Sequence, residues 1–141
     1  GEVLLSCAHA DGVELHGLPP VHRCVGFTVD AAAASAGRWI GQVGRQHQPE
    51  LFEALVPAKD RLASISRTHF ELSLPEGPGG PVTLRKLSGN PLLLDDRPLF
   101  QQEVVQLREG ARLAFTGTAE TDPSFLEFRL RLRSQQQVQS E

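Results

Sequence analysis

The chain has 141 residues, 40% of them hydrophobic and 22% charged, and its formal net charge is −3. A chain of this length favours one domain whose core needs neither a disulfide nor a structural metal. The slightly acidic balance excludes a general basic field for nucleic acid, and no run approaches the roughly 18 apolar residues of a membrane-spanning helix.

The amino-terminal part predicts two strands, at residues 2–8 and 24–29, because short apolar runs lie there between turn residues. Each strand carries one cysteine. Two cysteines are too few for a disulfide scaffold, so we expect Cys7 and Cys24 to be small core residues in a reducing compartment. A Cys7–Cys24 bridge is the alternative for a secreted protein. The alanine-rich segment 30–37 predicts a loop or one helical turn.

Residues 49–56 form the clearest helical segment. Pro49 can occupy the first position of a helix, the sequence ELFEAL follows, and Pro57 ends it. We therefore predict a short helix inserted in a loop. It either extends a recognition surface or caps the domain, and we favour capping.

The rest of the chain predicts strands separated by turns. In segment 125–133 every second residue from Leu126 to Leu132 is apolar and the residues between them are charged, which is typical of a half-buried antiparallel strand. We predict an all-β fold over residues 1–134, a two-sheet antiparallel β-sandwich of about ten to eleven strands. The polar tail 135–141 is expected to be disordered.

Polar residues gather at three of the expected strand ends. Arg45 closes the sequence VGR, residues 66–69 read SRTH, and Asn90 closes the sequence LSGN. Loops at one end of a β-sandwich converge in space, and binding residues are concentrated on such loops. The sequence therefore predicts one polar site assembled from three separate segments.

Four pieces of the sequence, taken in order, resemble the forkhead-associated (FHA) domain: Gly44-Arg45, SRTH, SGN and LREGARLAFTG. The resemblance spans about residues 38–132. It implies a β-sandwich that binds phosphothreonine peptides through loops at one end. The residue types suit a phosphate group, which carries about −1.5 to −2 charge and three acceptor oxygens.

The resemblance implies a role for each residue of the binding loops. Arg45 and Ser66 are the primary phosphate contacts, and Arg67 is a further donor. A guanidinium offers a fork of N–H groups that matches phosphate oxygens. Asn90, next to Gly89, is implied to hold the main chain of the peptide, because a side-chain amide donates and accepts at once.

Other positions are implied to support or tune the site. Gly44 and His69 support it, and His69 braces the loops from beneath without touching phosphate. Thr68 is expected to face solvent or a neighbouring strand. Gly117 and Thr118 resemble the family region that reads the residue three positions after the phosphothreonine.

Three positions depart from the family pattern. Gly89 replaces the usual Ser or Thr, Pro91 stands where a glycine is usual, and Asp95 or Asp96 stands where a second Asn is common. Ser88 compensates only if the loop shifts, and an acidic Asp95 would favour a basic peptide. These departures keep open a second hypothesis, a degenerate FHA fold that mediates phospho-independent interaction or self-association.

An enzyme is not expected. Ser66 and His69 lie three apart on one expected strand and would point to opposite faces. The sequence has neither a G-x-S-x-G elbow nor a phosphate loop, and its five histidines show no metal-ligand spacing. We expect no cofactor and no metal. The expected partner is a phosphothreonine-containing protein or peptide, not a nucleic acid or a membrane. The chain is expected to be an intracellular module, nuclear or cytoplasmic, of a larger protein.

Overall fold

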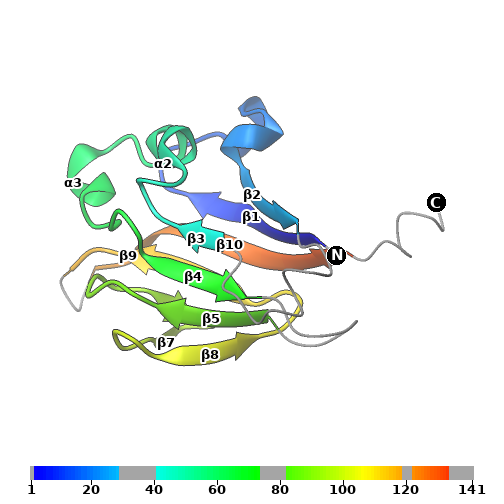
Figure 1. The fold of residues 1–141 in the computed structure, drawn as a ribbon. Coiled ribbons are helices and arrows are strands. Elements are labelled where there is room, and N and C mark those ends of the chain that lie inside the picture. Colours follow the sequence, from blue (N-terminus) through cyan, green and yellow to red (C-terminus); the bar gives the residue numbers. More distant parts are fainter. Residues whose placement is uncertain (1, 29–40, 74–81, 119–121, 134–141) are drawn as a thin grey trace.

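The computed structural model describes residues 2–28, 41–73, 82–118 and 122–133. Within them ten strands form two antiparallel sheets, one of six strands and one of four (Figure 1). This confirms the predicted two-sheet β-sandwich. The predictions for segment 30–37 and for the tail 135–141 lie outside the described residues.

The strand order of each sheet follows from its backbone pairing. The six-stranded sheet has the order β2-β1-β10-β9-β6-β7, with the bounds Cys24–Thr28, Glu2–Ala10, Ser124–Arg133, Arg112–Thr116, Leu93–Leu94 and Arg97–Pro98. The four-stranded sheet has the order β3-β4-β5-β8, with the bounds Gly41–Val43, Phe70–Ser73, Val82–Lys86 and Val104–Leu107.

An aromatic cluster joins the two sheets. Phe115 of β9 lies with its ring centroid 6.3 Å from that of Phe70 of β4, in the opposite sheet, and 6.2 Å from that of Phe128 of β10. Each aromatic side chain of this kind buries roughly 150–250 Å² of surface. The alternation predicted for β10 is confirmed, since its inward residues from Leu126 to Leu130 are buried.

The predicted helix is present as α2, Pro49–Leu55, and a second short helix, α3, follows at Lys59–Leu62. The inner face of α2 is buried, and the Phe52 ring lies 5.9 Å from Phe115 and 6.4 Å from Phe128. The helix therefore completes the core, which confirms capping. Two 3-10 turns, Leu15–Gly17 and Pro20–His22, lie between β1 and β2.

Both cysteines lie on neighbouring strands and both are free. Cys24 Sγ lies 3.8 Å from Ser6 Oγ, its partner across the β1–β2 pair. Burial raises the pKa of the Cys7 thiol to about 11, so it stays protonated at neutral pH. The structure thus has free thiols and no Cys7–Cys24 bridge.

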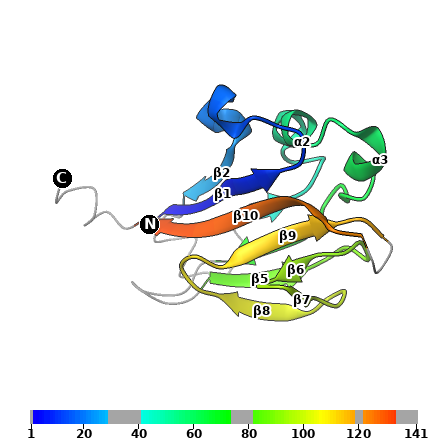
Figure 2. The ribbon, with the colours of Figure 1, turned by 180° about the vertical axis from the view of Figure 1, so that it is seen from behind.

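The registers bring the predicted site segments to one end of the sandwich. Val43 pairs with Phe70 and Phe70 pairs with Lys86, so β3 ends, β4 begins and β5 ends at the same edge. Figures 1 and 2 show this end opposite the start of β1 and the end of β10. The segments that follow or precede these strand ends therefore meet there.

Candidate functional site

The turn after β3 lies directly against the segment before β4. The Arg45 N–H donates to Ser66 O and the Gln46 N–H donates to Arg67 O, both at 3.1 Å. A Cβ atom on Gly44 would overlap the Arg67 carbonyl, so only glycine permits this close approach. Gly44 thus has the supporting position that the family pattern implies.

Arg45 is oriented by one hydrogen bond, from its Nε to the carbonyl of Ile65. The side chain is only partly buried, and no described residue accepts from its terminal amino groups. The bond at Nε fixes the guanidinium while its outer edge stays available. This is the geometry of an arginine that is positioned to bind an anion.

Ser66, Ser88 and Asn90 form one hydrogen-bond network. The two serine hydroxyls bond to each other, Asn90 Nδ2 donates to Ser66 Oγ at 2.9 Å, and the Asn90 N–H donates to Ser88 Oγ at 2.9 Å. The structure therefore brings the predicted residues Ser66 and Asn90 together. It also places Ser88 between them, without any need for the loop to shift.

His69 lies beneath this network and is fully buried, at 0% exposure. Its Nδ1 accepts from the Ser66 N–H and its Nε2 bonds to the Pro91 carbonyl, both at 3.1 Å, which requires the tautomer protonated on Nε2. Burial lowers the pKa of His69 to about 4, so the ring is neutral at physiological pH. These contacts hold His69 between the 66–69 turn and the loop at Pro91, which is the position that the family pattern implies for a bracing residue.

The prediction that Ser66 and His69 share one strand was wrong, because β4 begins at Phe70. Both residues lie in the turn before it and are in contact, so they do not point to opposite faces as expected. The contact runs through the Ser66 backbone N–H, however, and not through its hydroxyl. Both ring nitrogens of His69 are occupied, and the ring activates no nucleophile.

The other predicted residues fall into two groups. Arg67 and Gly89 are exposed in the loops that carry Ser66, Ser88 and Asn90, and Gly117 and Thr118 follow directly after β9, which ends at Thr116. The structure does not bring Asp95 to this group. Its Oδ1 accepts from the N–H of Arg112 at 3.0 Å, at the start of β9 and therefore at the opposite end of that strand.

Two site residues were missed by sequence reasoning. His47 Nε2 bonds to Thr68 Oγ1 at 2.8 Å and ties the two loops together, so Thr68 has a partner. Lys86 is buried at 2% exposure, with its ammonium donating to the Ser88 carbonyl. The alternation of Val82, Leu84 and Lys86 was the signal that this lysine points inward.

Comparison with known proteins identifies the family. The family model described as the FHA domain matches residues 42–116, which is 75 of the 141 residues. The chain belongs to the FHA domain family. The match contains the turn at Arg45, the Ser66–His69 turn and the Ser88–Asn90 loop.

Solved FHA domains have the same fold. The N-terminal FHA domain of Rad53p from S. cerevisiae, solved with a phosphothreonine peptide, has a TM-score of 0.60 and 17% identity, with 93% of each chain covered. An engineered FHA domain with a Myc-pTBD peptide has a TM-score of 0.61 and 17% identity, covering 99% of this chain and 97% of the other. A search of curated proteins found no match.

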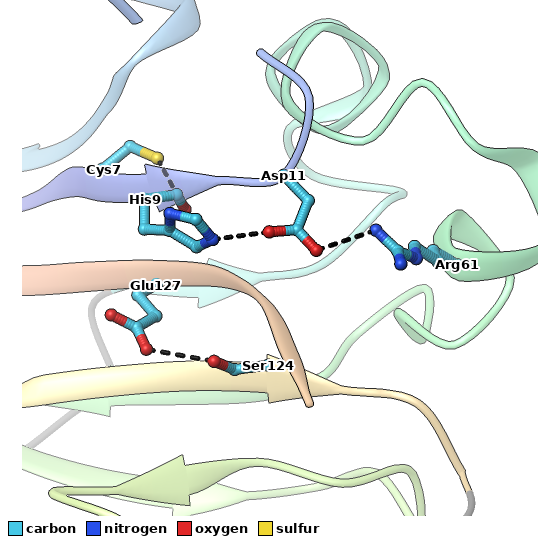
Figure 3. Close-up of polar contacts among 6 residues, drawn as sticks. All are labelled: Cys7, His9, Asp11, Arg61, Ser124 and Glu127. Atoms are coloured by element: carbon cyan, nitrogen blue, oxygen red, sulfur yellow. Dashed lines mark hydrogen bonds and ion pairs between the residues drawn. The ribbon is translucent and has the colours of Figure 1, made fainter. Parts of the chain in front are cut away.

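This FHA domain has a second polar cluster, beside α3 (Figure 3). His9 Nε2 lies 2.6 Å from Asp11 Oδ1, and Arg61 NH1 lies 3.0 Å from Asp11 Oδ2. Ser124 points away from His9 and donates to Glu127 at 3.0 Å. The cluster attaches α3 to β1 by charge pairing, and its serine has no histidine partner in the described structure.

None of the helices among the described residues is long and apolar enough to cross a membrane. The described residues also contain no group of three or more His, Cys, Asp and Glu side chains that is suited to hold a metal ion.

Proposed function

We propose that this FHA domain binds phosphothreonine in a partner protein through the loops at residues 44–48, 66–69 and 88–91. The observation that carries the proposal is the outer edge of Arg45, which has no described acceptor, in a turn whose backbone bonds to Ser66 of the Ser66–Ser88–Asn90 network. A phosphate group brings about −1.5 to −2 charge and three acceptor oxygens to this position.

Each residue then has a specific task. The terminal amino groups of Arg45 donate to two phosphate oxygens, and the Ser66 hydroxyl turns from Ser88 to a third. The exposed guanidinium of Arg67 adds positive charge at the mouth. Asn90 holds the peptide main chain, and the network fixes its amide in advance, which lowers the entropy cost of binding.

A second function, phospho-independent association, is favoured by one observation. The hydroxyls of Ser66 and Ser88 are bonded to each other, so the phosphate has to replace an existing bond. Gly89 also lacks the hydroxyl that the family pattern usually supplies. In this second function the loops bind an unmodified surface, and phosphorylation does not change the affinity.

We also propose that the domain acts as a binding module within a longer, intracellular protein and does not itself catalyse a reaction. This rests on the family and on a wider comparison. The region that is similar to Rad53 1–466, which was solved in complex with AMP-PNP, covers 94% of this chain but only 30% of that one, with a TM-score of 0.59 and 14% identity. There the similar region is one part of a larger chain.

The test is a titration of the domain with peptide libraries that differ only in one residue: phosphothreonine, phosphoserine or unmodified threonine. Phosphothreonine peptides are expected to bind with an affinity on the order of micromolar, about −8 kcal/mol, and unmodified peptides at least a hundredfold more weakly. Equal binding of phosphorylated and unmodified peptides would exclude the proposed function and support the second one.

A further inference from the structure

Lys86 is a buried cation whose ammonium bonds to the Ser88 carbonyl, in one of the loops of the proposed phosphate site. It is one of only two lysines in the chain, the other being Lys59 on α3, and it is 2% exposed. Lysine is almost never buried to this degree unless its charge is paired. Its position therefore requires an explanation.

The fold holds Lys86 in place at both backbone polar groups. Its N–H donates to Glu103 O at 3.0 Å and its carbonyl accepts from the Gln102 N–H at 2.6 Å. With its backbone fixed, Lys86 points its side chain inward from β5, and the ammonium reaches the Ser88 carbonyl. Ser88 Oγ contacts both Ser66 and the Asn90 N–H, so Ser88 alone connects the ammonium to the network.

No described carboxylate balances this charge. The Glu103 carboxylate is bonded to Arg97 and to the Phe100 N–H, and Glu71 is paired with Arg85. His69, the other titratable group near Lys86, is neutral. Burial accordingly lowers the pKa of Lys86 from 10.5. An ammonium without a counter-ion is costly to bury, and a nearby anion reduces that cost.

We propose that Lys86 is the second cation of the phosphate site, acting from beneath through the Ser88 loop, and that it makes the site select the phosphate dianion over singly charged groups. The inference rests on the proposed function of the loops. The partner is then a phosphorylated residue itself, and a glutamate in its place binds poorly. Lys86 is a positioning and electrostatic residue, since Ser88 lies between it and the ligand.

The direct test follows the charge of Lys86 by NMR in protein labelled at the lysine side chains, which gives two signals because the chain has two lysines. Lys59→Arg assigns them. Adding a phosphothreonine peptide is expected to raise the pKa of Lys86 by at least one unit and leave that of Lys59 unchanged, because an opposite charge favours the ammonium. Unchanged titration of Lys86 in a saturated complex would overturn the inference.

The second test is the affinity of Lys86→Gln, which keeps an N–H donor near the Ser88 carbonyl but removes the charge. Phosphothreonine peptide is expected to bind about tenfold more weakly, whereas Lys59→Gln binds as wild type. Wild-type affinity is also expected to fall as the pH rises through the pKa of Lys86 in the free protein, a fall that Lys86→Gln lacks.

The outcomes separate the inference from the proposed function. Binding of phosphothreonine peptide by the wild type, with the same affinity and the same alkaline pH profile in Lys86→Gln, overturns the inference alone. Absence of phosphate-dependent binding in the wild type overturns the proposed function, and the inference with it. If Lys86→Gln does not fold, the titration of the wild-type lysines still decides.

Discussion

At the loop end of the sandwich, Arg45 and Arg67 have no carboxylate partner among the described residues. Beside α3, in contrast, Arg61 is paired with Asp11 and Asp11 with His9. The two clusters contain similar residue types, but only the first leaves positive charge unbalanced above a buried scaffold. A balanced cluster holds two elements together, whereas an unbalanced one is suited to an anionic ligand.

The buried histidine is expected to give the largest difference between the clusters. The pKa of His69 is lowered to about 4 in the folded state, against about 6.5 unfolded. The neutral ring therefore contributes stability in full above pH 6.5, and this is lost progressively as the pH falls to 4, by about 3 kcal/mol. Denaturant unfolding at pH 7 and pH 4.5 measures the loss.

The control for that prediction is His9→Gln, a change in the second cluster. The His9 side chain is half exposed, so its ion pair is expected to contribute little to unfolding at either pH. If the pH dependence disappears in His9→Gln, it comes from His9 and not from His69, and the prediction is wrong.

Gly44→Ala is expected to have the next largest effect. Its Cβ would overlap the Arg67 carbonyl, so the bonds from the 44–48 turn to the 66–69 turn must open. We expect a loss of about 2–3 kcal/mol in unfolding free energy, together with weaker phosphopeptide binding. Gly89→Ala is the matched control, because its Cβ meets only Gln101 at 3.6 Å. Similar losses of unfolding free energy in Gly44→Ala and Gly89→Ala would contradict the account.

Ser88→Ala tests the hydrogen-bond network and is expected to be milder. It removes the bonds to Ser66 Oγ and to the Asn90 N–H, at a cost of about 1–2 kcal/mol. Ser124→Ala, which removes the Ser124–Glu127 bond of the second cluster, is expected to cost less than about 0.5 kcal/mol. Thermal unfolding of the two variants compares the clusters directly, and a larger loss for Ser124→Ala would reverse the comparison.

Arg61→Ala is expected to have the smallest effect. The side chain is partly exposed, and it loses one ion pair and a contact at 5.9 Å above the Phe125 ring. A destabilisation of about 0.5–1 kcal/mol is expected, with phosphopeptide affinity unchanged. An affinity loss in this variant would mean that α3 belongs to the recognition surface.

Much of the fold followed from the sequence because period-two alternation and turn residues are local signals. They predicted the sandwich, the inward face of β10 and the helix at Pro49. The start of β4 was misplaced, because Arg67 to His69 carry no signal that separates a turn from a strand. The turn is shown only by tertiary contacts: Gly44 lies against the Arg67 carbonyl, and the His69 ring accepts from the Ser66 N–H.

The composition of the site was harder to predict than its location. The family pattern brought Arg45, Ser66 and Asn90 together, and the structure places them side by side. The family pattern did not predict Ser88 within the network, because the pairing of two hydroxyl groups depends on the distance between their loops. The family pattern predicted that Asp95 belongs to the site, but the antiparallel register of β6 with β9 places Asp95 beside Arg112.

The most direct test of the account is a double-mutant cycle between Arg45 and the phosphate. It compares wild type and Arg45→Ala with phosphothreonine and unmodified threonine peptides, and uses Arg131→Ala, an exposed arginine on β10, as the control. The account predicts a coupling free energy of about 2–3 kcal/mol for Arg45 and none for Arg131, with both variants still folded and only a small fall in the melting temperature of Arg45→Ala from the lost bond to Ile65. A coupling below about 0.5 kcal/mol for Arg45 in a folded protein would contradict it.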